Sequence, residues 1–289
     1  MGTATPWPEG RPFAVALSHD VDRVAKRGQF AYYLPLALLK GRWGLLRQHL
    51  ASLRATLRGY DPFWSFPTLM ALEEELGVRS TFFVLNETGK ARLFSPRSWM
   101  LYTGRYQMRS PQIEGMLREL VAGGWEIGLH GSYRSFEDEA LLRWEKAELE
   151  VAAGVRVLGG RQHYLNLLVP ETWEAHAAIG LRYDSTLGYT RRIGLRWGTS
   201  RPFFPRHPRT GQTIPVLQIP MAIMDGPLMA MSHPEGAVAA LIEQVEQEQG
   251  VLTINFHSQY FNHYEHQSWL DAYRSLVLRC QARAAWFAP

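Results

Sequence analysis

The chain has 289 residues, of which 46% are hydrophobic and 20% are charged, and its formal net charge is +4. This composition excludes an intrinsically disordered chain, which needs low hydrophobicity and high net charge. The single cysteine, Cys280, excludes an internal disulfide framework and a multi-cysteine metal site. We expect one domain over residues 1–289, because this length suits a single α/β barrel.

Short apolar runs alternate with helical patterns along the chain, which is typical of βαβ units. The expected strands are residues 13–18, 80–85, 125–129, 155–158, 182–187, 217–224 and 251–256. The expected helices are residues 136–153, 172–179, 232–250 and 268–285. The third of them begins with capping-box spacing between Ser232 and Glu235. About seven strands separated by helices predict a closed or nearly closed parallel barrel. In such barrels the chemistry lies at the carboxyl ends of the strands.

The first expected strand runs into two carboxylates, Asp20 and Asp22. In an extended chain, residues two apart point to the same side, roughly 7 Å from each other. Unpaired at a buried strand end, these carboxylates would repel each other and be costly to desolvate. A metal ion, or an arginine together with a metal, would remove both problems. The alternative is an aspartate cap on a following helix.

Three further strand ends carry polar side chains. The third expected strand leads to His130, the fourth to Arg161 and the last to His257. A lone histidine at a strand end is more often structural than a ligand. Polar side chains of these types at four separate strand ends, however, predict an active site.

These motifs resemble those of the polysaccharide deacetylases, also called the NodB-homology or carbohydrate esterase family 4 fold, between residues 13 and 258. The resemblance implies a distorted (β/α) barrel of parallel strands. Asp20 and Asp22 are similar to the Asp-x-Asp form of the first motif, which implies that Asp20 is the general base and Asp22 a metal ligand. His130 matches the first histidine of the second motif, also a metal ligand, and Arg134 stands where the family has the second.

The third motif and the last strand extend the resemblance. Arg161 and Tyr164 match an Arg-x-Pro-Tyr motif in which His163 replaces the proline, and His257 matches the late histidine. The resemblance implies that Arg161 orients Asp20 and that the backbone N–H of Tyr164 helps to bind the oxyanion. It also implies that His257 is the general acid.

We expect a divalent metal as the cofactor, and specifically zinc. Arg134 bears on this expectation, because it replaces a histidine of the family's metal-binding motif. A catalytic zinc site needs three protein ligands and an open position, and arginine cannot ligate. His163 is the expected third ligand, because it lies within the third motif. The alternatives are Asp184, a water-rich site, or no metal at all. The residues expected to contact substrate are Ser132, Tyr133 and Asp184.

The resemblance implies a hydrolase that removes an N-acetyl or related acyl group from a sugar in polysaccharide or lipopolysaccharide biosynthesis. The alternatives are a metal-free amidase on the same fold and a non-catalytic glycan- or membrane-binding relative. Arg134 favours these alternatives, whereas Asp20, Arg161 and His257 together favour an enzyme. Because the sequence shows neither a secretory signal nor an apolar run long enough to span a bilayer, we expect a cytoplasmic protein.

Residues 23–60 contain eight lysines and arginines and no aspartate or glutamate, interleaved with leucines and aromatics in a helical, amphipathic pattern. We expect a basic helical insertion at about residues 23–66, beside the catalytic carboxylates. One interpretation is a pair of helices that pack on the barrel and expose a solvated basic face. The other is a platform for an anionic or lipid-linked glycan, or for the inner membrane surface. We do not expect nucleic acid, because no recognition motif accompanies the charge.

Overall fold

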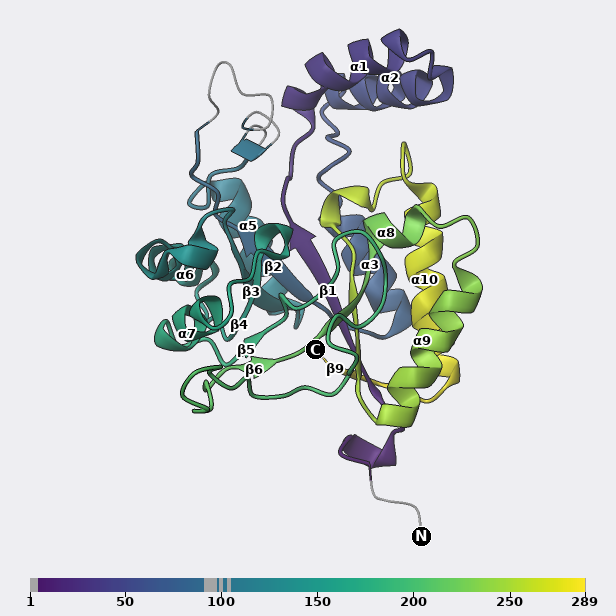
Figure 1. The fold of residues 1–289 in the computed structure, drawn as a ribbon. Coiled ribbons are helices and arrows are strands. Elements are labelled where there is room, and N and C mark those ends of the chain that lie inside the picture. The colour runs from purple at the N-terminus through teal and green to yellow at the C-terminus, as the bar shows by residue number, and fades with distance from the viewer. Residues whose placement is uncertain (1–4, 91–97, 99–100, 103–104, 289) are drawn as a thin grey trace.

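A curled sheet of parallel strands forms the centre of the computed structural model, which describes residues 5–90, 98, 101–102 and 105–288 (Figure 1). Nine strands belong to this sheet: β1 (Ala14–Val21), β2 (Thr81–Leu85), β3 (Glu126–Gly131), β4 (Gly159–Gln162), β5 (Tyr183–Asp184), β6 (Leu217–Gln218), β7 (Met221–Met224), β8 (Val251–Asn255) and β9 (Trp286–Ala288).

The strand order is β6-β5-β4-β3-β2-β1-β8-β7, and neighbouring strands pair in parallel. β9 pairs with the start of β1, beside residues 14–16. The order begins with β6 and ends with β7, so the barrel stays open between these two strands. The prediction of a distorted parallel barrel is therefore confirmed, in the form of a half-barrel.

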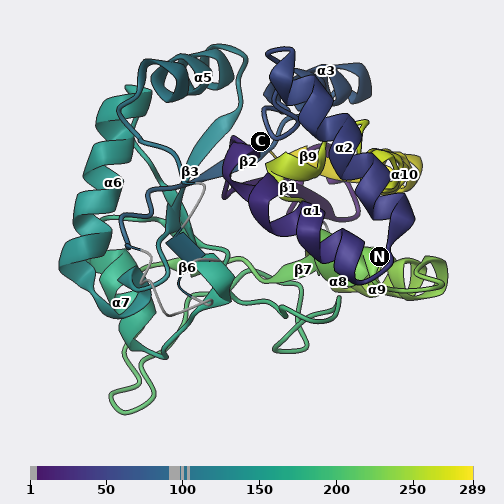
Figure 2. The same cartoon turned by 90° about the horizontal axis from the view of Figure 1, so that it is seen from above.

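Helices flank the half-barrel on both sides, and the first two lie above the carboxyl end of β1 (Figures 1 and 2). They are α1 (Phe30–Leu39), α2 (Trp43–Leu57), α3 (Phe66–Leu76), α5 (Pro111–Ala122), α6 (Glu139–Ala153), α7 (Glu171–Ala178), α8 (Asp225–Met229), α9 (Glu235–Glu248) and α10 (Gln267–Ala282). Short 3-10 turns include η2 (Arg27–Gln29), η3 (Ser135–Glu137), η4 (His163–Leu165) and η5 (Ser258–Tyr260). Within the described ranges, no helix is long and apolar enough to cross a membrane.

The core between the sheet and the outer helices is apolar and holds the strand ends in place. On α3, Leu69, Leu72 and Leu76 recur every three or four residues, so they bury one helical face against the sheet. On α10, Tyr273 and Val277 do the same from the next helix. Each such side chain stabilises the fold by about 1.5–3 kcal/mol.

Three expectations about elements are wrong in detail. Residues 155–158 are a loop, and the strand begins after them as β4. Its glycines leave room for neighbouring side chains. A Cβ added at Gly159 would lie 1.9 Å from the Tyr183 ring, and one added at Gly160 would lie 2.6 Å from Leu181. The run 217–224 is two strands, β6 and β7. The expected capping box is absent, since α9 follows Pro234 without a side-chain cap.

The expected basic insertion contains two helices, α1 and α2, which lie side by side above the carboxyl end of β1 (Figure 1). The strand β9 and the helices α3 and α5 were not expected from the sequence. The assignment of residues 1–289 to one domain stays a prediction.

Candidate active site

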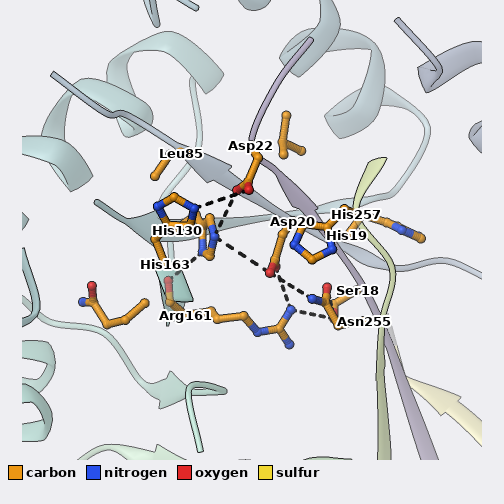
Figure 3. Close-up of polar contacts among 12 residues, drawn as sticks. Ser18, His19, Asp20, Asp22, Leu85, His130, Arg161, His163, Asn255 and His257 are labelled. Atoms are coloured by element: carbon orange, nitrogen blue, oxygen red, sulfur yellow. Dashed lines mark hydrogen bonds and ion pairs between the residues drawn. The ribbon is translucent and has the colours of Figure 1, made fainter. Parts of the chain in front are cut away.

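Asp20 lies on β1 with its side chain inside the half-barrel, where two other strands supply its partners (Figure 3). Arg161 of β4 donates from Nη1 to Oδ1 of Asp20 at 2.8 Å, and Asn255 of β8 donates from Nδ2 to Oδ2 at 2.9 Å. Burial alone would raise the pKa of Asp20, but Arg161, His130 and His257 together outweigh it and the pKa falls to about 2. Asp20 is therefore a carboxylate at neutral pH.

Arg161 is fully buried and is itself held from several sides. Its Nε and Nη2 donate to the backbone oxygen and the hydroxyl of Ser185 at 3.2 and 3.0 Å, and Nη1 also donates to the Ser18 hydroxyl at 2.9 Å. The guanidinium lies 4.3 Å from the centre of the Phe83 ring. This side chain is consequently fixed in the orientation that meets Asp20.

Asp22, His130 and His163 form a cluster beside Asp20, and their candidate ligand atoms all lie within 4.8 Å of one another. His130 Nε2 lies 3.4 Å from Oδ1 of Asp22, and His163 Nε2 lies 3.3 Å from Oδ2. The three residues follow or end β1, β3 and β4, which lie close together in the strand order. The structure therefore brings together the three residues that the sequence analysis assigned to a metal.

The cluster has the features of a ligand set. His130 Nδ1 lies 2.9 Å from the carbonyl oxygen of Arg161, which can only accept, so Nδ1 donates and Nε2 is the nitrogen left to face Asp22 and a metal. Burial lowers the pKa of His163, although Asp22 opposes this, which favours the neutral form that binds metals. Within the described part of the chain, Asp22 Oδ1 and His163 Nδ1 are buried without a hydrogen-bond partner. Two histidines and one carboxylate fit a divalent ion with an open position.

His257 follows β8 and pairs with a carboxylate that the sequence analysis did not identify, Asp225. Its Nδ1 lies 3.0 Å from Oδ1 of Asp225, and its backbone N–H donates to Oδ2 at 2.8 Å. Burial alone would lower the pKa of His257, but Asp225 outweighs it and raises the pKa to about 10. Asp225 directly follows β7, so the strand-end rule that found the other site residues was the signal that could have found it.

Tyr133 and Tyr164, both expected near the substrate, lie at the edge of the cluster. The Tyr164 ring packs 4.5 Å from the His163 ring and 5.6 Å from the Tyr133 ring, measured between centres. Tyr164 has a φ of +59°, a left-handed conformation that is rare for a residue with a side chain and that occurs often at functional sites. Its predicted role in binding an oxyanion stays a prediction.

The structure places Ser132, Asp184 and Arg134 in three different surroundings. Ser132 is buried, and its backbone N–H donates to Oε2 of Glu145 at 3.1 Å. Asp184 is fully buried and accepts two hydrogen bonds from Thr186, so its carboxylate is outside the three-residue group. Arg134 is exposed in the turn before η3.

Comparison with solved structures relates this half-barrel to known proteins. A Mycobacterium smegmatis protein assigned as a polysaccharide deacetylase is 20% identical over 99% of this chain and 90% of its own, with a TM-score of 0.58. The chain has the polysaccharide deacetylase fold. Puue allantoinase and a Pseudomonas aeruginosa protein assigned as a polysaccharide deacetylase are each 16% identical over 99% of this chain and 91% of theirs, with TM-scores of 0.58. No protein-family model and no curated protein sequence matches the chain.

The resemblance to polysaccharide deacetylases drawn from the sequence motifs is thus confirmed at the level of the fold. An allantoinase shares the same fold, so the fold alone does not determine the substrate. The function has to be argued from the side chains of the site.

Proposed function

We propose that the protein is a metal-dependent hydrolase that removes an acyl group from the nitrogen of an amino sugar. The observation that supports this most directly is the cluster of Asp22, His130 and His163 beside the ionised Asp20. The cluster also holds buried polar atoms of Asp22 and His163 that lack hydrogen-bond partners, which is costly unless a ligand fills them.

A divalent ion, by expectation zinc, held by Asp22, His130 and His163 would supply a water of lowered pKa and polarise the acyl carbonyl. Asp20 accepts the proton of the attacking water, and its bond to Arg161 keeps the carboxylate ionised and oriented. The His257 imidazolium, kept protonated at neutral pH by Asp225, donates a proton to the leaving amine.

Two backbone and ring features complete the proposed site. The N–H of Tyr164, in the strained turn η4, donates to the oxyanion of the tetrahedral intermediate. The rings of Tyr133 and Tyr164 form one wall beside the cluster, and such rings stack on the apolar faces of sugars. The substrate that we propose is an N-acetylated sugar used in polysaccharide or lipopolysaccharide assembly, and it includes glycans that are carried on a lipid.

The test measures acetate release from a panel of N-acetylated amino sugars and their oligosaccharides, with zinc-loaded wild-type protein and the Asp20→Asn variant. We expect Asp20→Asn to lower kcat by a factor of about 100 or more, since a general base contributes that much. Zinc content should stay at one equivalent, because Asp20 lies outside the ligand set. Asp271→Asn, a change at an exposed carboxylate on α10, is the matched control and should behave as wild type.

Three outcomes would contradict the proposal. Near-normal turnover by Asp20→Asn would remove Asp20 from the chemistry. Full activity after chelation, with no zinc remaining, would indicate a metal-free amidase instead. A zinc-loaded protein that binds sugars of the panel and releases no acyl group from any of them would indicate a glycan-binding protein.

A further inference from the structure

The hairpin of α1 and α2 exposes apolar side chains to an extent seen nowhere else in the described chain. Of eighteen exposed large apolar side chains among the described residues, nine lie between residues 32 and 60. They are Tyr32, Tyr33, Leu38, Leu39, Trp43, Leu45, Leu50, Leu57 and Tyr60. The other nine are spread between residues 144 and 278, as is usual for scattered surface positions.

Packing on the barrel does not account for this composition. α1 carries no charged residue, and a helix that is apolar all round is normally buried. Here only Phe30 and Ala37 of α1 are buried, and only Ser52, Ala55 and Thr56 of α2. Leu39 is 84% exposed and Trp43 is 63% exposed. The hairpin thus presents an apolar surface that nothing in the described structure covers.

The charge on the same hairpin indicates what covers it. Residues 23–60 contain no aspartate or glutamate, and six of their basic side chains are exposed: Arg27, Lys40, Arg42, Arg47, Arg54 and Arg58. Basic side chains among leucines, tyrosines and tryptophan match the interface of an anionic bilayer, whose head groups attract cations and whose acyl boundary takes apolar side chains. A second copy would bury the apolar groups but would bring like charges together.

The hairpin is attached firmly next to the candidate active site. Lys26, which precedes the hairpin, donates to Glu265, a residue of the loop that follows His257. The Ser52 hydroxyl of α2 also donates to Glu265, and His49 Nδ1 lies 3.2 Å from the same carboxylate. These groups are mostly buried, so the hairpin keeps a fixed position at the carboxyl end of the barrel (Figures 1 and 2).

We propose that the α1–α2 hairpin docks on an anionic phospholipid surface and turns the mouth of the site towards it. The helices have 10 and 15 residues, a length suited to lying in the plane of the interface rather than crossing a core that requires about 20. A substrate anchored in lipid would then reach the site directly. This last step rests on the proposed function, whereas docking itself does not.

The test is co-sedimentation with vesicles of phosphatidylglycerol mixed with phosphatidylcholine, compared with vesicles of phosphatidylcholine alone. We expect wild-type protein to sediment with the anionic vesicles at low salt and to be released near 1 M salt, where the Debye length is about 3 Å. Arg42→Glu with Arg47→Glu should weaken binding at least about 25-fold, since each basic residue near the surface adds about fivefold. Leu38→Ser with Leu39→Ser should weaken it at least about tenfold.

Matched controls use exposed residues elsewhere. Arg209→Glu, in a loop before β6, and Leu278→Ser, on α10, should bind as wild type does. The proposal fails if wild-type protein ignores anionic vesicles at low salt, or if the hairpin variants bind unchanged. It also fails if the variants only convert a dimer into a monomer, which would show that a second copy covers the surface. Because the readout is binding, loss of docking and loss of hydrolysis can be told apart.

Discussion

Two buried polar clusters lie on opposite faces of β1, and they differ in how completely they are hydrogen-bonded. On the helix side, Nδ1 of His19 lies 2.9 Å from the carbonyl oxygen of Phe256, and Nε2 lies 2.9 Å from Oε1 of Glu73. The Glu73 carboxylate also accepts from Tyr273, Trp125 and Ser80, at 2.5, 2.6 and 2.9 Å. On the barrel side, Asp22 and His163 keep buried atoms that have no hydrogen-bond partner among the described residues.

Burial of charge alone does not identify a functional site in this protein. His19 and Asp20 are adjacent and equally buried, and both belong to charged networks. The His19 network joins β1 to α3 and α10 and has its bonding capacity filled, so it acts as a structural link. The Asp22 cluster has capacity left over, which a ligand would fill. Three predictions test this distinction.

The largest effect is expected from Glu73→Gln. The amide nitrogen of glutamine would face side chains that donate, and His19 would lose its anionic partner, so we expect a loss of about 3 kcal/mol in the free energy of unfolding. This corresponds to a fall of roughly 5–10 °C in the thermal midpoint. Glu75→Gln, on the same helix but in an exposed pair with Arg274, should leave the midpoint unchanged. A Glu73→Gln variant as stable as the wild type would contradict the structural role assigned to the His19 network.

The second prediction concerns zinc. Zinc at 100 times its dissociation constant should stabilise the chelator-treated wild-type protein by about 2.7 kcal/mol, because it binds only the folded state. Zinc should raise the free energy of unfolding of Glu73→Gln by the same amount, although this variant is less stable without zinc. Zinc should not stabilise Asp22→Ala or His163→Ala. Differential scanning calorimetry with and without zinc measures this. Equal stabilisation of Asp22→Ala would place the metal elsewhere.

The smallest effect is expected at Asp225. The Asp225 carboxylate keeps the folded-state pKa of His257 above its unfolded value, so protonated His257 predominates until the pH rises through about 10. Asp225→Asn should lower this pKa, and the alkaline fall in kcat/KM should move to lower pH by about one unit or more, equivalent to about 1.4 kcal/mol. A nuclear magnetic resonance titration of His257 checks the assignment. An unchanged alkaline limb would exclude His257 as the acid.

The parts of this molecule that could be predicted were those encoded in local pattern. Alternation at Asp20 and Asp22, together with the strand-end rule at His130 and His257, located most of the site because parallel strands bring their carboxyl ends to one edge. Asp184, inside the expected strand 182–187, was named by resemblance instead, and its carboxylate accepts from Thr186.

The parts that could not be predicted depend on contacts between distant segments. The strand β4 reads Gly-Gly-Arg-Gln and shows no apolar alternation, because its glycines make room for Tyr183 and Leu181. The strand-end rule could have found Asp225 as a residue, but its pairing with His257 forms only when β7 pairs with β8. The side chains of the α1–α2 hairpin are likewise exposed because the hairpin lies above the carboxyl end of the barrel, where the sheet does not cover it. No sequence window contains that information.

The pairing of β1 with β8 has a consequence for synthesis of the chain. Asn255 pairs with Ser18 and donates to Asp20, so the Asp20 carboxylate meets this partner only after 235 further residues have been made. At 5–20 residues per second, that delay lasts roughly 10–50 s on the ribosome. During this time the edge of β1 is open to pairing with other chains. Rapid chaperone binding to the nascent chain should therefore matter more for the yield of this protein than its final stability.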